Sequence, residues 1–290
     1  MKLRDFIPPI LTLAAKNLRR SPRPEGCPPA SPRATFPTYN DALKECETFG
    51  YEAANLVQVV FHKTVAYRDA LLKSPPQITP SDSLALFAVG LALRSTAPIT
   101  VLDFGGACGA HYFRMRTLLR PDVRLRWHVI ETPAMAKAAI PIHTEELSFS
   151  DSLHEVRKSL DHIDIVFSSG TLQCVPNPHE ILKQLLDCRA SYLVLPRLGL
   201  SETTADVITV HEARLSDNGP GPMPAGIQDG TTRYPFTFPA RTAIETSMMN
   251  EYEIILSVAD PSGVFAVNQE PLLGLGYVAR AKAFREHRNP

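Results

Sequence analysis

Hydrophobic residues between positions 38 and 96 recur at the spacing of a helix face. Leu56, Val59, Val60 and Val65 give the clearest example, and Thr38 is a typical N-cap residue at the start of the region. The pattern predicts helices over residues 38–51, 52–74 and 81–96. The third segment is the most apolar, so we expect it to be the most buried. Together they predict a helical N-terminal region over residues 1–95, interrupted by a proline-rich linker or loop at 21–37.

The pattern changes at residue 99, where short apolar, β-branched runs begin to alternate with helical segments. Strands are predicted at 99–106, where the run ends in glycines, and at 125–131, 147–151, 164–170 and 191–197, and helices at 110–120, 133–142 and 178–189. The strands lack a strict polar–apolar alternation, which is typical of a parallel sheet covered on both faces. The fold class predicted for residues 96–290 is therefore α/β, a Rossmann-like, doubly wound and mainly parallel sheet.

The C-terminal part has a different composition. Residues 218–239 are rich in glycine and proline, and we expect a loop over 211–239 to cover the site of a second substrate. Tyr234, Phe236 and Phe238 alternate as in a strand; they could line an apolar pocket or belong to the core. A helix over 242–250 and a closing hairpin from 252–260 and 272–282 are predicted after it.

The sequence VLDFGGACGA, residues 101–110, places three glycines directly after a strand: Gly105, Gly106 and Gly109. Glycines let a backbone come close to a ligand, and the helix that follows offers free N–H groups at its N-terminus. Asp103 lies just inside the strand end, and Glu131 ends the next strand, where a carboxylate can accept ribose hydroxyls. The pattern predicts a nucleoside-binding loop.

The charges around this loop favour a cationic ligand. A dinucleotide site is expected to have the spacing G-x-G-x-x-G, which D-F-G-G-A-C-G lacks. S-adenosyl-L-methionine (SAM) carries an ammonium, a sulfonium and a ribose diol, which suit Asp103 and Glu131. The alternatives are a strand-to-helix turn that needs glycine only for its shape, and an NAD(P)-dependent oxidoreductase.

Several stretches resemble known methyltransferases. Residues 101–116 resemble motif I of class I SAM-dependent methyltransferases. Together with WHVIETPAM, DIVFSSGTLQCVPNP, TRYPFTFP and the N-terminal MKLRDFIPPIL, they resemble a bacterial methyltransferase family often linked to surface-polysaccharide gene clusters. Cys108 and the segment LPRLGL at 195–200 depart from the pattern expected of that family.

The resemblance implies roles for individual residues. Asp103, Gly105, Gly106 and Gly109 would line the methionine part of SAM, and Glu131 would hold the ribose. The remaining implied cofactor contacts are Asp151, toward the adenine amine, and Ser168, Ser169 and Leu172, at the face where transfer occurs. The implied activity is methyl transfer to O or N of a small-molecule or sugar-containing metabolite in natural-product or polysaccharide biosynthesis.

Methyl transfer depends mainly on positioning, and a general base is needed only when the acceptor holds its proton tightly. The candidates for catalysis are His111 and Tyr112, at the start of the helix after the glycine loop. His111 could act as a base or orient a hydroxyl, but it could equally cap the helix or contact the cofactor. A protein that binds SAM without catalysis is a further alternative.

The composition excludes some classes of partner. Thirty basic residues balance thirty acidic ones, so no global field attracts nucleic acid. The five cysteines form no C-x-x-C pair, and the histidines lack metal-ligand spacing; we therefore expect no disulfide framework, no metal site and a reducing cytoplasm. Residues 1–20 have basic positions around an apolar centre but no following cleavage site, which is compatible with peripheral membrane contact. The apolar helices are compatible with a homodimer.

Overall fold

The computed structural model describes residues 33–46, 53–93 and 97–282. The chain divides into two compact units, Met1–Arg33 and Ala34–Pro290, and the second contains all but one of the described residues. The predicted membrane-contacting segment 1–20 lies outside the described residues, and so does most of the proline-rich segment. None of the helices in the described ranges has the length and apolar run needed to cross a bilayer.

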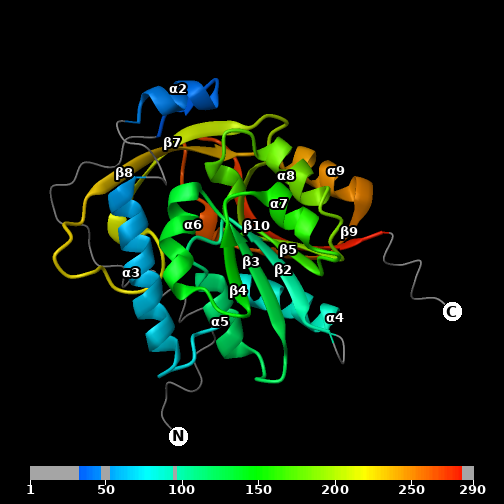
Figure 1. Ribbon diagram of the computed structural model, residues 1–290. Helices are drawn as coiled ribbons and strands as arrows, with labels where there is room; N and C mark the ends of the chain where they lie inside the picture. Colours follow the sequence, from blue (N-terminus) through cyan, green and yellow to red (C-terminus); the bar gives the residue numbers. More distant parts are fainter. Residues whose placement is uncertain (1–32, 47–52, 94–96, 283–290) are drawn as a thin grey trace, which may run out of the picture. The chain divides into compact units, whose positions relative to one another are not determined.

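A seven-stranded sheet forms the centre of the second unit (Figure 1). Its strands are β2 (Ile99–Phe104), β3 (Leu125–Ile130), β4 (Leu147–Ser150), β5 (Ile165–Phe167), β6 (Tyr192–Ser201), β9 (Tyr252–Ala259) and β10 (Leu272–Ala281). The order across the sheet is β4-β3-β2-β5-β6-β10-β9. The first five strands in this order are parallel to one another, whereas β10 is antiparallel to both β6 and β9. This confirms the predicted doubly wound, mainly parallel sheet and its closing hairpin.

The strand order reverses between β2 and β5. From β2 the chain moves outward through β3 to β4, and it then returns to place β5 on the other side of β2. Asp103 is level with Val129 of β3 and Phe167 of β5, so the carboxyl ends of these strands meet at one edge. Ligands of open α/β sheets bind at such a switch point, which is therefore the expected position of a site.

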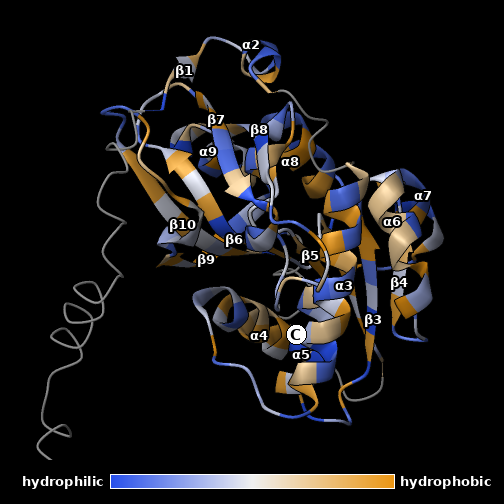
Figure 2. Cartoon of the chain, turned by 90° about the vertical axis from the view of Figure 1, so that its left-hand side faces the viewer, coloured by the Kyte–Doolittle hydropathy of each residue, from blue (hydrophilic) through white to orange (hydrophobic). Residues whose placement is uncertain are grey.

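Helices cover both faces of the sheet. The described helices are α2 (Tyr39–Lys44), α3 (Ala54–Leu71), α4 (Pro80–Ala92), α5 (Ala110–Leu118), α6 (Pro133–Ala139), α7 (Leu153–Ser159), α8 (Pro178–Leu186) and α9 (Arg241–Glu251). One hydrophobic cluster joins α4 and α5 to the sheet, and a second joins α8 and α9, with α7 beside them, to the opposite face. In Figure 2, α3 and α5 carry both hydrophobic and hydrophilic residues, as helices with one buried side do.

The predicted N-terminal helices are present but do not form a separate layer. α4 contributes Leu84, Ala88 and Val89 to the same core as the central strands. α3 packs on α5 and α6, in a third cluster that includes Cys108. The boundary expected at residue 95 therefore does not divide the packing, because residues 34–290 make up one compact unit.

A second, three-stranded sheet contains part of the segment expected to be a loop. β7 (Val207–Arg214) pairs antiparallel with β8 (Thr231–Phe238), and the two-residue strand β1 (Thr35–Phe36) pairs with β7. The loop predicted over 211–239 is thus a long hairpin with an irregular end between its strands. The alternation of Tyr234, Phe236 and Phe238, which predicted a strand, is confirmed by β8.

A buried ion pair joins α4 to α5. Arg114 Nε donates to Asp82 Oδ1 and Arg114 Nη2 donates to Asp82 Oδ2, both at 2.6 Å. Asp82 also completes a capping box with Thr79 at the start of α4. Burial acts to raise the pKa of Asp82, but the hydrogen bonds from Arg114 and Thr79 outweigh it and hold that pKa below its ordinary value. Arg114 therefore has a structural role, joining α5 to α4.

Replacing Arg114 by Met should destabilise the protein by about 3 kcal/mol, because it leaves the Asp82 carboxylate buried without its partner. Folding lowers the pKa of Asp82, so the Asp82–Arg114 pair stabilises the protein fully at any pH above the pKa of an unfolded aspartate, about 3.9. This contribution is lost as the pH falls through the lower pKa that Asp82 has in the folded protein. Urea unfolding at several pH values measures both effects. Arg120→Met is the matched control, because its pair with Asp122 is exposed, and it should change the free energy of unfolding by less than about 0.5 kcal/mol.

Candidate functional site

The loop between β2 and α5 lies at the switch point of the sheet. Gly105 and Gly109 adopt left-handed backbone angles, with φ of 75° and 78°. Ala107 does so as well, at φ 49°, although it has a side chain. The N-terminus of α5 has no side-chain cap, so its first N–H groups are left to other partners. The loop therefore presents backbone donors at the carboxyl edge.

Two of the predicted glycines are required by contacts within the protein. A Cβ on Gly106 would lie 2.4 Å from Asp103 Oδ2, and one on Gly105 would lie 2.2 Å from Thr171 Oγ1. The loop after β2 thus rests on the Asp103 carboxylate and against the turn that follows β5. Close approach to the protein itself is enough to explain glycine at both positions.

Asp103 is completely buried beneath this loop. Its Oδ2 accepts a hydrogen bond from Trp127 Nε1 at 3.0 Å and lies 3.3 Å from His111 Nδ1. Its Oδ1 is buried and has no hydrogen-bond partner among the residues that the structure describes. The carboxylate therefore supports the loop and His111 from below instead of facing open solvent.

Glu131 lies at the end of β3 and is half-buried. Its Oε1 accepts a hydrogen bond from the backbone N–H of Ala107 at 2.9 Å, and its Oε2 accepts one from Thr132 at 2.8 Å. Burial is the largest effect on the pKa of Glu131 and raises it, and the negative charge of Asp103 raises it further. The two backbone hydrogen bonds lower this pKa, but the net shift is upward. Each oxygen keeps a lone pair, so the carboxylate can still accept two further donors.

Buried polar atoms without partners gather after β5. The Oγ atoms of Ser168 and Ser169 and the Oε1 of Gln173 have none among the described residues. Gln173 Nε2 donates to the carbonyl of Arg197 at 3.1 Å, so this side chain joins the turn after β5 to β6. Unpaired buried groups are unusual in folded proteins, so these atoms and Asp103 Oδ1, at the ends of the neighbouring strands β5 and β2, make this edge a candidate binding site.

The remaining predicted cofactor residues have different environments. Asp151 follows β4 and its side chain is exposed at the same edge. Leu172 is 1% exposed and packs in the core on the α8 side, so it does not line the open edge in this conformation. Cys108 is also buried; its Sγ lies 3.5 Å from Met135 Sδ, and burial raises its pKa to about 12, as for a small hydrophobic residue.

The two candidates for catalysis are placed at opposite ends of the strands. His111 packs edge-on against Phe167, with ring centroids 5.0 Å apart, and its side chain is partly exposed. Tyr112 is buried, and its hydroxyl donates to Glu146 at 2.9 Å; Glu146 also accepts from Leu125, the first residue of β3. Burial and this hydrogen bond raise the pKa of Tyr112 to about 12. The structure thus brings His111 to the candidate site but not the Tyr112 hydroxyl.

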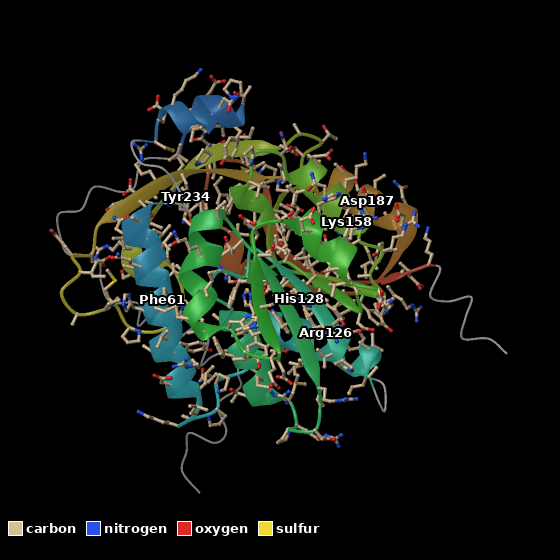
Figure 3. The ribbon with its side chains drawn as sticks, in the orientation of Figure 1. Phe61, Arg126, His128, Lys158, Asp187 and Tyr234 are labelled. Carbon is tan, nitrogen blue, oxygen red and sulfur yellow. The ribbon has the colours of Figure 1, made fainter. Side chains whose placement is uncertain are left out.

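An aromatic cluster lies between the second sheet and the loop before β10. The His211 ring stacks on Phe265 at 4.5 Å and contacts Tyr234, whose position is labelled in Figure 3, at 5.2 Å. Phe236 and Phe238 are almost completely buried in the same cluster. These two residues therefore belong to the core, and the ring of His211 packs against Phe236 as well.

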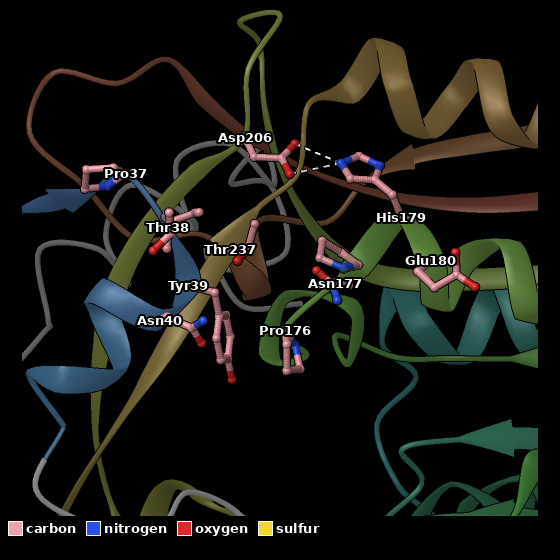
Figure 4. Close-up of a pocket in the computed structure, with 12 residues that line it drawn as sticks. Pro37, Thr38, Tyr39, Asn40, Pro176, Asn177, His179, Glu180, Asp206 and Thr237 are labelled. Atoms are coloured by element: carbon pink, nitrogen blue, oxygen red, sulfur yellow. Dashed lines mark hydrogen bonds and ion pairs between the residues drawn. The ribbon is translucent and has the colours of Figure 1, made fainter.

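A separate pocket of about 610 Å³ lies beside α2, α8 and the β7–β8 hairpin (Figure 4). His179 Nε2 lies 3.0 and 2.9 Å from the two carboxylate oxygens of Asp206 at its rim. Thr237 is 2% exposed, and its hydroxyl has no partner among the described residues. None of the individual cofactor-binding or catalytic residues predicted from the sequence lines this pocket.

Two features of the site escaped sequence reasoning. Trp127 donates a hydrogen bond to Asp103, and the only sequence signal for this contact was that Trp127 lies in the strand predicted next after β2. Arg197 lies in the segment LPRLGL, whose departure from the expected pattern was the one available signal. Over the ranges that the structure describes, no cluster of His, Cys, Asp and Glu has a geometry able to hold a metal ion.

No protein-family model matches the chain, and no curated protein matches it. Among solved structures, the N-terminal domain of EvdMO1 with SAH bound is 16% identical, with a TM-score of 0.42, over 71% of this chain and 82% of that one. A SAM-dependent methyltransferase from Clostridium acetobutylicum is 9% identical, with a TM-score of 0.42, over 69% and 90%. A SAM-bound amino pentose methyltransferase from Micromonospora echinaspora, involved in calicheamicin biosynthesis, is 15% identical, with a TM-score of 0.40, over 70% and 92%. Similarities at this level do not assign a function.

Replacing Gly106 by Ala should destabilise the protein by about 2 kcal/mol or more, because the new methyl group would overlap the buried Asp103 carboxylate. Gly90→Ala is the matched control: a Cβ there meets nothing within 4 Å, and alanine in helix α4 should stabilise by about 0.5–1 kcal/mol. Thermal unfolding of both variants gives the comparison. Equal melting temperatures would show that the loop does not rest on Asp103.

Proposed function

We propose that this protein is a SAM-dependent methyltransferase that acts on an oxygen or nitrogen of a small-molecule or sugar-containing metabolite. The Rossmann-like sheet and the motif I resemblance of residues 101–116 support the class. The choice of acceptor follows from the sequence resemblance alone.

The observation that carries the proposal is the arrangement of Glu131. Its carboxylate lies at the switch point, is fixed by the N–H groups of Ala107 and Thr132, and keeps two acceptor positions. A ribose diol presents two adjacent hydroxyl donors, which match a carboxylate held in this way. We infer that Glu131 binds the ribose hydroxyls.

The charges support a cationic nucleoside over a dinucleotide. Asp103 and Glu131 place two carboxylates around the loop, and their mutual repulsion contributes to the raised pKa of Glu131. A positive ligand relieves that repulsion, whereas a pyrophosphate increases it. The loop also lacks the G-x-G-x-x-G spacing of a dinucleotide site. The free N–H groups at the start of α5 remain suited to the carboxylate end of a methionine.

When bound, SAM supplies a methyl group on a positively charged sulfur. The residues of this chain would align the acceptor and accept its proton. Asp103 can fix the His111 tautomer that carries hydrogen on Nδ1, which leaves Nε2 to accept a proton or to orient a hydroxyl. In this proposal His111 is the base, Asp103 positions it, and Tyr112 has a structural role.

Glu131→Gln should weaken SAM binding roughly 10- to 100-fold, because a charged acceptor of hydrogen bonds is lost. In the unaltered protein, affinity should fall as the pH is lowered toward the raised pKa of Glu131, at a pH above the ordinary glutamate value of about 4.3. Calorimetric titration with SAM between pH 5 and pH 8 (roughly the range in which a raised carboxyl titrates) tests both expectations.

The control for this experiment is Glu155→Gln, an exposed glutamate on α7, which should keep the affinity and its pH dependence. If Glu131→Gln bound SAM as tightly as Glu155→Gln, the assignment of the ribose site would be wrong. Binding of NADH in place of SAM, followed by its fluorescence, would favour the oxidoreductase alternative.

His111→Gln should lower kcat by about 10²–10⁴-fold and leave the SAM dissociation constant within a few-fold, as expected for loss of a general base. The measurement needs an acceptor, found by screening sugars and hydroxylated metabolites with radiolabelled SAM. An unchanged kcat in the variant would exclude His111 as the base.

A further inference from the structure

A β-bulge in β6 turns one arginine outward at the carboxyl edge. Leu195 is opposite Tyr277 of β10 and Leu198 is opposite Leu275, so Pro196 and Arg197 together face Gly276. Such two-against-one bulges redirect a side chain and are frequent beside active sites. Arg197 is exposed, although the residues on both sides of it are buried.

The backbone of Arg197 is held in a conformation that a residue with a side chain rarely adopts. Its φ is 57°, in the left-handed region, at a cost of about 1–2 kcal/mol. Its N–H donates to Asp260 Oδ2 at 3.1 Å, and its carbonyl accepts from Gln173 Nε2 at 3.1 Å. The carbonyl of Pro196 accepts from the N–H of Gly170 at 3.1 Å. Asp260 and Gln173 are each 1% exposed, so buried contacts fix this conformation.

The side chain of Arg197 lies over the turn that follows β5. Its guanidinium carbon would be 3.9 Å from a Cβ built on Gly170. The residues just before Gly170 are Ser168 and Ser169, whose hydroxyls have no hydrogen-bond partner in the described part of the chain. β6 is parallel to β5, with Val194 level with Phe167, so Arg197 extends past the same edge as Glu131 and His111. A cationic group is thus placed beside the predicted transfer face.

Within the described part of the chain, the Arg197 guanidinium has no ion pair and no hydrogen bond to another side chain. Arg114, Arg241 and Arg280 each pair with a carboxylate. Asp260, the acidic residue that contacts Arg197, directs its oxygens to backbone N–H groups and to the hydroxyls of Ser81 and Ser262. The fold therefore fixes the backbone of Arg197 and leaves the N–H donors of its guanidinium for a ligand.

We propose that Arg197 binds a carboxylate or phosphate group of the methyl acceptor, with the hydroxyl of Ser169 as a second donor. This inference rests on the proposed function, because it places the acceptor at the edge where the cofactor would lie. It narrows the acceptor from any hydroxylated metabolite to one that carries an oxyanion. Arginine presents two parallel N–H donors to such groups, which a lysine does not reproduce.

The test uses Arg197→Gln and Arg197→Gly, with Arg189→Gln as the matched control. Arg189 is also an exposed arginine with a left-handed backbone, φ 52°, but it lies before the opposite end of β6. The glycine variant removes the guanidinium while relieving the backbone, so its melting temperature should not fall. Inorganic phosphate and acetate are titrated separately at constant ionic strength, by calorimetry, into the free protein and the SAH-saturated protein.

We expect at least one of the two anions to bind the unaltered protein and the control equally, and to bind both Arg197 variants about tenfold or more weakly. The anion that binds the unaltered protein more tightly, phosphate or acetate, indicates which of the two groups the acceptor carries. SAH affinity should stay within about twofold in all variants. Equal anion affinity in all proteins, or none in the unaltered protein, would overturn the proposal.

The carboxylate of the cofactor is the other oxyanion that Arg197 could hold. In that case the Arg197 variants would lose affinity for SAH but not for 5′-methylthioadenosine, which lacks the amino-acid part, and the proposal would be wrong. If the unaltered protein bound no SAH at all, the proposed function would fail. The anion titration of the free protein would still report on Arg197 separately.

Discussion

A carboxylate without solvent contact, that of Asp103, determines the shape of the candidate site. Burying a charge is costly unless other groups compensate it, and here the indole N–H of Trp127 and the ring of His111 do so. The loop above can close over the carboxylate only because position 106 has no side chain. The positions of the loop, of His111 and of the N-terminus of α5 all follow from this one buried group.

The second constraint is the hydrogen bond from Ala107 to Glu131. It joins the loop after β2 to the end of β3, so the two carboxylates of the site are connected by three residues of backbone and held at fixed positions. The left-handed conformation of Ala107 aims its N–H, and a similar conformation at Arg197 aims a side chain. Strain at both positions lies beside the same strand ends, which is where strained residues of enzymes are commonly found.

Much of the fold could be predicted from the sequence because the signals are local. Apolar β-branched runs predicted the parallel strands, and helical spacing predicted α3 and α4. The alternation of aromatic residues predicted β8. Glu131 could be predicted as a site residue because parallel strands end at one edge. The direction of the Tyr112 hydroxyl could not, since it depends on Glu146, which approaches from another part of the chain. The loop expected over 211–239 was a hairpin because strand pairing with β1 and between its own arms outweighed its turn-rich composition.

The position of β10 has a consequence for the order in which the molecule assembles. This strand is the last of the sheet along the chain, yet it lies between β6 and β9. During synthesis, β2 to β6 can associate while the place beside β6 is still empty, and both partners of β10 must wait for residues 272–281 to leave the ribosome. The bulge at Pro196 and Arg197 is defined by pairing with β10, so this part of the carboxyl edge takes its paired form only after β10 has joined the sheet.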